Sequence, residues 1–193
     1  MINVGHIETE IPKHFVVPNM LLLAGSGQNV GKTSFAVDAI KHLKKFGNVV
    51  YGLKITPHFH TSNPTHLIVQ TDDYQIALEK DFLGNKDSSR MLKAGADEVF
   101  FVQTTTDNAL LDVFDFVNRM AKENVLWVCE SGGLRFFVDP GVFLYFKHKN
   151  QEAQKESAKK LMPLANRIVE FDGSSFDLPV NQISVSENKL ILD

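Results

Sequence analysis

The 193-residue sequence has a single cysteine, no long apolar run and no excess of basic charge. Cys129 cannot form an internal disulfide, and it lies in an apolar run, which fits a reduced cytoplasmic setting. The longest apolar stretches, such as residues 20–24 and 125–129, are far too short to span a bilayer. The N-terminus lacks the basic start and apolar core of a signal peptide. We therefore expect a cytoplasmic protein without a membrane segment.

The charge balance disfavours a nucleic-acid partner. The 20 Lys and Arg residues are outnumbered by 23 Asp and Glu residues, which gives a formal net charge of −3. Because no strongly basic surface is required, the composition disfavours non-specific nucleic-acid binding. Apolar residues make up 44% of the chain, as in ordinary globular proteins, and the length suits one domain. We expect residues 1–193 to form a single domain.

Short apolar runs alternate with segments of helical periodicity. Strands are expected over residues 20–24, 48–55, 99–103, 124–130, 142–146 and 167–171. Helices are expected over residues 32–46, 107–122 and 151–162. This alternation predicts an α/β fold with three layers, in which helices cover both faces of a mostly parallel sheet. Residues 1–19 are interpreted as an N-terminal extension, and the alternating pattern within residues 173–193 predicts a closing hairpin.

Residues 57–83 fit this alternation least well. They have weak periodicity, and a loop this long in a compact domain is usually functional or mobile, so we expect an insertion or a mobile loop. The spacing His58-x-His60, with His66 nearby, raises a zinc hypothesis. No cysteine pair or adjacent carboxylate completes a ligand set, and a polar loop or substrate contact is the favoured alternative.

Residues 24–33, Ala-Gly-Ser-Gly-Gln-Asn-Val-Gly-Lys-Thr, lie between a predicted buried strand and an amphipathic helix. This context is typical of a phosphate-binding loop, although an ordinary glycine-rich turn is the alternative. Glycines let backbone N–H groups converge on an anion, and the helix N-terminus adds partial positive charge. Lys32 would neutralise the β- and γ-phosphates, and the Thr33 hydroxyl would bind Mg²⁺. The expected nucleotide-binding set is Gly25, Ser26, Gly27, Gln28, Asn29, Val30, Gly31, Lys32, Thr33 and Ser34.

The loop departs from the usual spacing, because Ser26 stands five residues before Gly31 and the first loop glycine is Gly25. This longer loop resembles those of dethiobiotin synthetase and the cobyrinic acid amide synthases, which belong to the group that includes the MinD and ParA ATPases. The resemblance implies a P-loop NTPase fold. The signature lysine of MinD-type loops is absent, which argues against dimer-coupled switching of that kind.

Two further segments resemble the molybdopterin-guanine dinucleotide biosynthesis protein B family. Residues 84–99 resemble that family's Gly-Lys-Asp-Ser…Ala-Gly-Ala segment, and residues 54–58 resemble its Ile-Lys-His segment. Lys54 to Pro57 also resembles the Tyr-Lys-Pro of dethiobiotin synthetase. The resemblance covers roughly residues 20–146, and it is interrupted at residues 61–82, which look like an insertion.

Three residues outside the loop complete the expected site. Glu130 ends a predicted buried strand before a glycine-rich turn, where an acid can hold Mg²⁺, although it could simply end the strand. For Lys54 the resemblance implies contact with phosphate or substrate, and the alternative is a solvated lysine. Asp87 is a candidate second Mg²⁺ ligand, a water-positioning acid, or the N-cap of a short helix over residues 88–94.

These residues support three functional hypotheses. The first is a Mg²⁺-dependent nucleoside triphosphate-binding protein, a slow NTPase that assists cofactor biosynthesis, with Lys32, Lys54 and Asp87 as catalytic residues. The second is an ATP-dependent synthetase that activates a small acidic substrate, with Arg135 as a clamp. The third is a nucleotide-binding partner module without turnover. No Asn-Lys-x-Asp motif is present, so the choice between ATP and GTP stays open, as does a homodimer.

Overall fold

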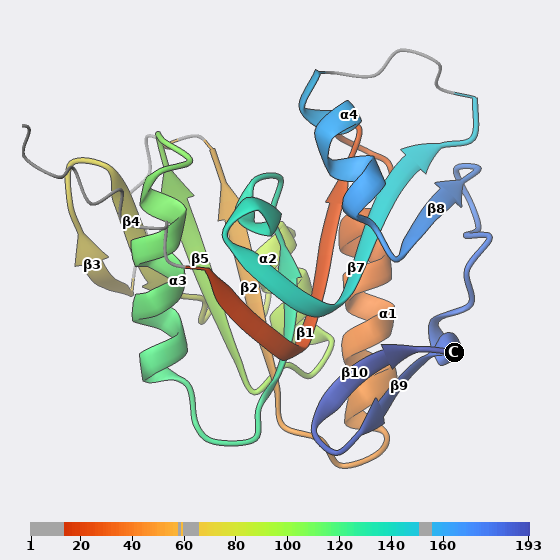
Figure 1. Ribbon diagram of the computed structural model, residues 1–193. Helices are drawn as coiled ribbons and strands as arrows, with labels where there is room; N and C mark the ends of the chain where they lie inside the picture. The colour runs from red at the N-terminus through yellow and green to blue at the C-terminus, as the bar shows by residue number, and fades with distance from the viewer. Residues whose placement is uncertain (1–13, 58, 60–65, 151–155) are drawn as a thin grey trace, which may run out of the picture.

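The computed structural model of the chain describes residues 14–57, 59, 66–150 and 156–193 (Figure 1). The main sheet has eight strands in the order β3-β4-β5-β2-β6-β1-β7-β8. Its strands are β1 (Phe15–Gly25), β2 (Val50–Thr56), β3 (Leu67–Gln70), β4 (Tyr74–Leu78), β5 (Glu98–Thr104), β6 (Leu126–Glu130), β7 (Val138–His148) and β8 (Arg167–Phe171). The helices are α1 (Lys32–Lys44), α2 (Asp87–Lys93), α3 (Ala109–Met120) and α4 (Glu156–Leu161). The 3₁₀ turns are η1 (Leu134–Phe136), η2 (Met162–Leu164) and η3 (Val180–Gln182).

The centre of the sheet is parallel. Strand β1 pairs in parallel with β6 and β7, β2 pairs in parallel with β5 and β6, and β7 pairs in parallel with β8. A separate antiparallel hairpin consists of β9 (Ile183–Ser186) and β10 (Lys189–Leu192). The predicted α/β fold, with a mostly parallel sheet and a C-terminal hairpin, is confirmed. No helix in the described ranges is long and apolar enough to cross a bilayer.

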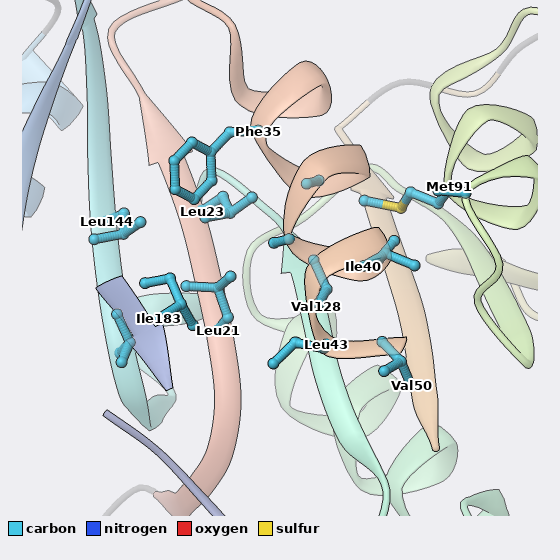
Figure 2. Packing of buried hydrophobic residues seen from close by; sticks show 14 of the residues in the cluster. Leu21, Leu23, Phe35, Ile40, Leu43, Val50, Met91, Val128, Leu144 and Ile183 are labelled. Atoms are coloured by element: carbon cyan, nitrogen blue, oxygen red, sulfur yellow. The ribbon is translucent and has the colours of Figure 1, made fainter. Parts of the chain in front are cut away.

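Helices cover both faces of the sheet. Successive side chains of a strand point to opposite faces, and in the central strands the side chains on both faces are apolar and are buried by helices. In β1, Met20 and Leu22 belong to the core cluster that includes buried residues of α3, whereas Leu21 and Leu23 belong to the cluster with α1 and α2. Figure 2 shows this second cluster, in which Leu21 and Leu23 lie among side chains from α1, α2 and neighbouring strands. The central strands are therefore apolar on both faces, as their continuous hydrophobic runs predict.

One boundary differs from the sequence predictions, and another lies partly outside the described residues. Residues 15–19, expected in an N-terminal extension, belong to β1, which begins at Phe15 and has an irregular register between Val17 and Leu21. The predicted helix over residues 151–162 is described from Glu156 onward, and residues 151–155 lie outside the described part of the chain.

The range 57–83, expected to be an insertion or a mobile loop, contains regular structure. Residues 67–78 contain strands β3 and β4, which pair with each other in an antiparallel manner. Strand β4 in turn pairs antiparallel with β5 and extends the sheet at one edge. Alternation is weak here because both strands of the hairpin carry polar residues such as Gln70 and Gln75.

Candidate functional site

The segment between β1 and α1 is a tightly packed loop. A Cβ added at Gly25 would lie 2.7 Å from the Phe146 carbonyl oxygen, and the Val30 side chain is buried. Gly31 has a φ of +86°, a conformation that glycine adopts without strain, and it directly precedes the first residue of α1. The exposed residues Gln28 and Asn29 form the tip of the loop.

The N-terminus of α1 carries no acid that would repel an anion. Its first turn contains no acidic residue, and its N-cap residue, Gly31, makes no side-chain capping hydrogen bond. Lys32, the first residue of the helix, turns back so that its Nζ donates a hydrogen bond to the Gly27 carbonyl oxygen at 2.6 Å. Backbone N–H groups at a helix start lack partners within the helix, and together with the dipole they favour negative charge. The loop thus combines uncapped donors with a lysine.

Three more of the expected site residues gather beside Thr33. The Thr33 hydroxyl donates to Oε2 of Glu130 at 2.8 Å, and Oε1 of the same carboxylate lies 2.7 Å from the Lys54 ammonium. Lys54 also lies 2.7 Å from Oδ2 of Asp87. Strands β2 and β6 place Lys54 directly beside Glu130, because the two residues are paired in the parallel register. The first residue of α2 supplies Asp87.

Burial and charge set the protonation of this cluster. Burial opposes the charge of Lys54, yet the nearby Glu130 and Asp87 outweigh it and raise the pKa of Lys54. Burial likewise opposes ionisation of Asp87, but its hydrogen bond with Lys54 and the positive charge there hold the pKa of Asp87 below its usual value. For Lys32, burial and the charge of Lys54 lower the pKa against the attraction of Glu130. Lys54 and Asp87 therefore hold each other in their charged forms.

The oxygen atoms of this cluster suit a hard cation. In the described ranges, no three His, Cys, Asp or Glu side chains gather into a metal site by themselves. Thr33, Asp87 and Glu130 nevertheless present one hydroxyl and two carboxylates around a common point, since all three contact Lys54 or one another. Mg²⁺ prefers such oxygen ligands and needs few of them, because phosphates and water complete its octahedron. The donor set therefore fits Mg²⁺ bound together with a phosphate.

One contact was missed by the sequence analysis. The Arg90 guanidinium donates from Nη2 to the Ser34 hydroxyl at 3.2 Å, and its Nη1 lies 3.9 Å from Oδ1 of Asp87. Arg90 thereby links α2 to the start of α1. The contact with Asp87 could have been predicted, since residues three apart on a helix share a face and Arg90 follows Asp87 at that spacing. No pattern in the sequence marks the contact with Ser34.

Other expected residues lie elsewhere or have other roles. The Arg135 guanidinium has protein partners, since its Nη1 lies 2.7 Å from Asp139 and its Cζ lies 5.8 Å from the centroid of the Phe143 ring. Asp87 is not an N-cap, since Lys86 precedes the helix and no side chain in the described ranges caps it. His66 is exposed, and His58 and His60 lie outside the described residues. Cys129 is buried in the core, and this burial raises the pKa of its thiol.

Replacement of Gly31 by alanine should destabilise the protein through strain and a steric clash. The φ of +86° disfavours a side chain, and the new Cβ would lie 2.5 Å from Cε1 of Phe176. We expect a loss of about 2–5 kcal/mol in the free energy of unfolding, measured by thermal or urea denaturation. Gly47→Ala is the matched control, because Gly47 has a φ of +77° but no atom within 4 Å of the added Cβ. An equal loss in both variants would contradict the clash.

Comparison with known proteins gives no assignment: no family model, curated protein or solved structure matches this chain. Any function must therefore be inferred from the chemistry of the site itself.

Proposed function

We propose that the chain is a Mg²⁺-dependent nucleoside triphosphate-binding protein with a P-loop NTPase fold, and that it hydrolyses its nucleotide slowly. One observation carries the proposal: Thr33, in the first turn of α1, donates to Glu130, whose carboxylate also contacts Lys54. Lys32 and Asp87 lie at the edges of the same cluster. A glycine loop, a lysine and a paired hydroxyl and carboxylate are the parts that phosphoryl-transfer sites share.

In this proposal the loop holds the triphosphate. Lys32 exchanges its bond to the Gly27 carbonyl for the β- and γ-phosphates, while the uncapped N–H groups of α1 face the anion. An ammonium that already lies over the loop needs to move little to reach the phosphate. Binding energy is therefore not spent on ordering a distant side chain.

Thr33, Glu130 and Asp87 would hold Mg²⁺, which neutralises phosphate charge when bound. Lys54 would offset the charge that develops on the phosphates during transfer, because its ammonium lies between the two carboxylates beside the loop. Asp87 is ionised and its side chain is 41% exposed, so it is also able to orient a water molecule for attack.

The resemblances at residues 54–58 and 84–99 extend the proposal to a role in cofactor biosynthesis, with a protein partner or a small acidic substrate. The base, adenine or guanine, is left to experiment. Calorimetric titration of ATP and of GTP, with and without Mg²⁺, tests the binding, and phosphate release tests turnover. We expect binding of at least one nucleotide to be tighter with Mg²⁺. If neither nucleotide binds under either condition, the proposal is wrong.

Substitution of Glu130 by glutamine should remove much of this Mg²⁺ dependence. The amide retains the shape of the side chain but loses the negative charge that faces Lys54 and Thr33. We expect the enhancement of nucleotide binding by Mg²⁺ to fall by about 10–100-fold, as for loss of an important group around a metal. The exposed Glu123, which precedes β6, provides the control variant Glu123→Gln. If the Mg²⁺ dependence of Glu130→Gln were unchanged, Glu130 would not be a ligand of the metal.

A further inference from the structure

Lys54 lies between the two carboxylates that a divalent cation would also use. Its ammonium is 2.7 Å from Oδ2 of Asp87 and 2.7 Å from Oε1 of Glu130. The Lys54 side chain is 14% exposed and that of Glu130 is 5% exposed, so water screens this contact poorly. The remaining Glu130 oxygen, Oε2, accepts the hydrogen bond from Thr33. Both carboxylates are thus already paired with positive charge or with a donor.

The cluster has no excess of negative charge. Lys32, Lys54 and Arg90 contribute three positive charges, and Asp87 and Glu130 contribute two negative charges, so the formal sum is +1. A divalent cation entering between the carboxylates would meet the Lys54 ammonium at a distance of a few ångströms, where repulsion in a half-buried site is strong. A metal and this lysine therefore compete for the same oxygen atoms.

We propose that Lys54 is a built-in competitor that keeps the oxygen set of Thr33, Asp87 and Glu130 closed to divalent cations until a triphosphate draws the ammonium away. The lysine stem is flexible, and a γ-phosphate offers the ammonium a new anionic partner. Cation and nucleotide then bind together. The cation takes the place of the ammonium beside Glu130, so that the buried carboxylate has a positive partner both before and after binding. The triphosphate that draws the ammonium away rests on the proposed function. The competition between Lys54 and the cation does not depend on that function.

The competition predicts a gain of metal binding when the lysine charge is removed. In Lys54→Met the local formal charge falls from +1 to zero, and no ammonium lies between the two carboxylates. We expect this variant to bind Mn²⁺ alone, without nucleotide, about 10–100-fold more tightly than the wild-type protein, the range usual for coupling between two sites. Free Mn²⁺ is measured by electron paramagnetic resonance during titration of the full chain. The added substitution Glu130→Gln should abolish the gain and so locate the metal.

Two variants separate the competition from general effects of lysine removal. Lys54→Arg retains the positive charge and should bind Mn²⁺ as weakly as the wild type. Lys44→Met removes an ammonium that also lies 2.7 Å from a carboxylate, that of Asp97, but away from the loop, and should leave Mn²⁺ binding unchanged. Equal Mn²⁺ affinity of Lys54→Met and wild type would overturn the proposal. So would micromolar binding of Mn²⁺ by the wild-type protein alone, a test that holds even if Lys54→Met does not fold.

The same samples distinguish this inference from the function on which it draws. A wild-type protein that binds ATP or GTP while Lys54→Met gains no Mn²⁺ affinity retains the proposed function and refutes the competition. A protein that binds no nucleotide but gains Mn²⁺ affinity in Lys54→Met refutes the function and supports the competition.

Discussion

Replacing Lys32 with alanine should weaken nucleotide binding by about 100-fold or more and abolish measurable phosphate release. The reason is that the Lys32 ammonium is the positive charge that lies over the loop itself, bonded to the Gly27 carbonyl oxygen. Loss of one charged partner in a desolvated contact usually costs about 2–5 kcal/mol. This free energy corresponds to a loss of affinity of about 30–5,000-fold. Calorimetric titration of ATP and GTP in the presence of Mg²⁺ measures the change.

Folding should be little affected by this substitution, so that lost binding is not mistaken for unfolding. Lys32→Ala removes a single hydrogen bond, a loss of about 1 kcal/mol. Lys41→Ala is a suitable control, because Lys41 is an exposed lysine of the same helix far from the loop. If Lys32→Ala binds nucleotide as well as the control does, the segment 25–34 is an ordinary strand–helix turn.

Replacing Trp127 with alanine should produce the largest loss of stability. Trp127 is fully buried in β6, and its ring packs against Tyr51, Phe100 and Phe114 at centroid distances of 5.6, 6.1 and 6.4 Å. Removal of the indole leaves a cavity among three aromatic rings that cannot close around alanine. We expect the free energy of unfolding to fall by about 3–5 kcal/mol and the melting temperature by about 6–20 °C.

The exposed Phe46 supplies the comparison, since its side chain is 72% exposed. Phe46→Ala should change the free energy of unfolding by less than about 0.5 kcal/mol in the same urea titration. A loss below about 1.5 kcal/mol in Trp127→Ala would mean that the surrounding rings repack. Because Glu130 lies three residues farther along β6, nucleotide binding measured on folded Trp127→Ala also reports how strongly the core holds the site.

The fold was predictable where the apolar pattern is strong. The helix over residues 107–122 and the strand over residues 124–130 have regular periodicity or continuous burial, and both were placed within a few residues. Strands β3 and β4 were missed, because β3, at the edge of the sheet, has no fully buried residue and both strands carry polar residues such as Gln70 and Gln75, which weakens the apolar pattern. Likewise, the predicted start of β1 was too late. The polar Asn19 interrupts the apolar pattern, and the prediction therefore began at residue 20 rather than at Phe15. The Asn19 side chain instead donates to the Val125 carbonyl oxygen at 2.7 Å.

For the candidate site, the residues were predicted from the sequence, and the structure shows the contacts among them. Lys32, Thr33 and Glu130 were predicted from motif and position, since the carboxyl ends of neighbouring parallel strands meet at one edge of a sheet. That Lys54 contacts both Asp87 and Glu130 could not be predicted, because it depends on the register of β2 against β6 and on the docking of α2.

The central position of β1 also affects how the chain is made. Strand β1 precedes every other described element, yet its partners β6 and β7 begin only at Leu126 and Val138. About 100 residues of synthesis separate β1 from its first partner, which corresponds to roughly 5–20 s at the usual rate of translation. During that interval the apolar residues 20–24 emerge from the ribosome without the strands that bury them. Protection by a chaperone, or by transient contact with α1, is therefore most valuable at this stage of synthesis.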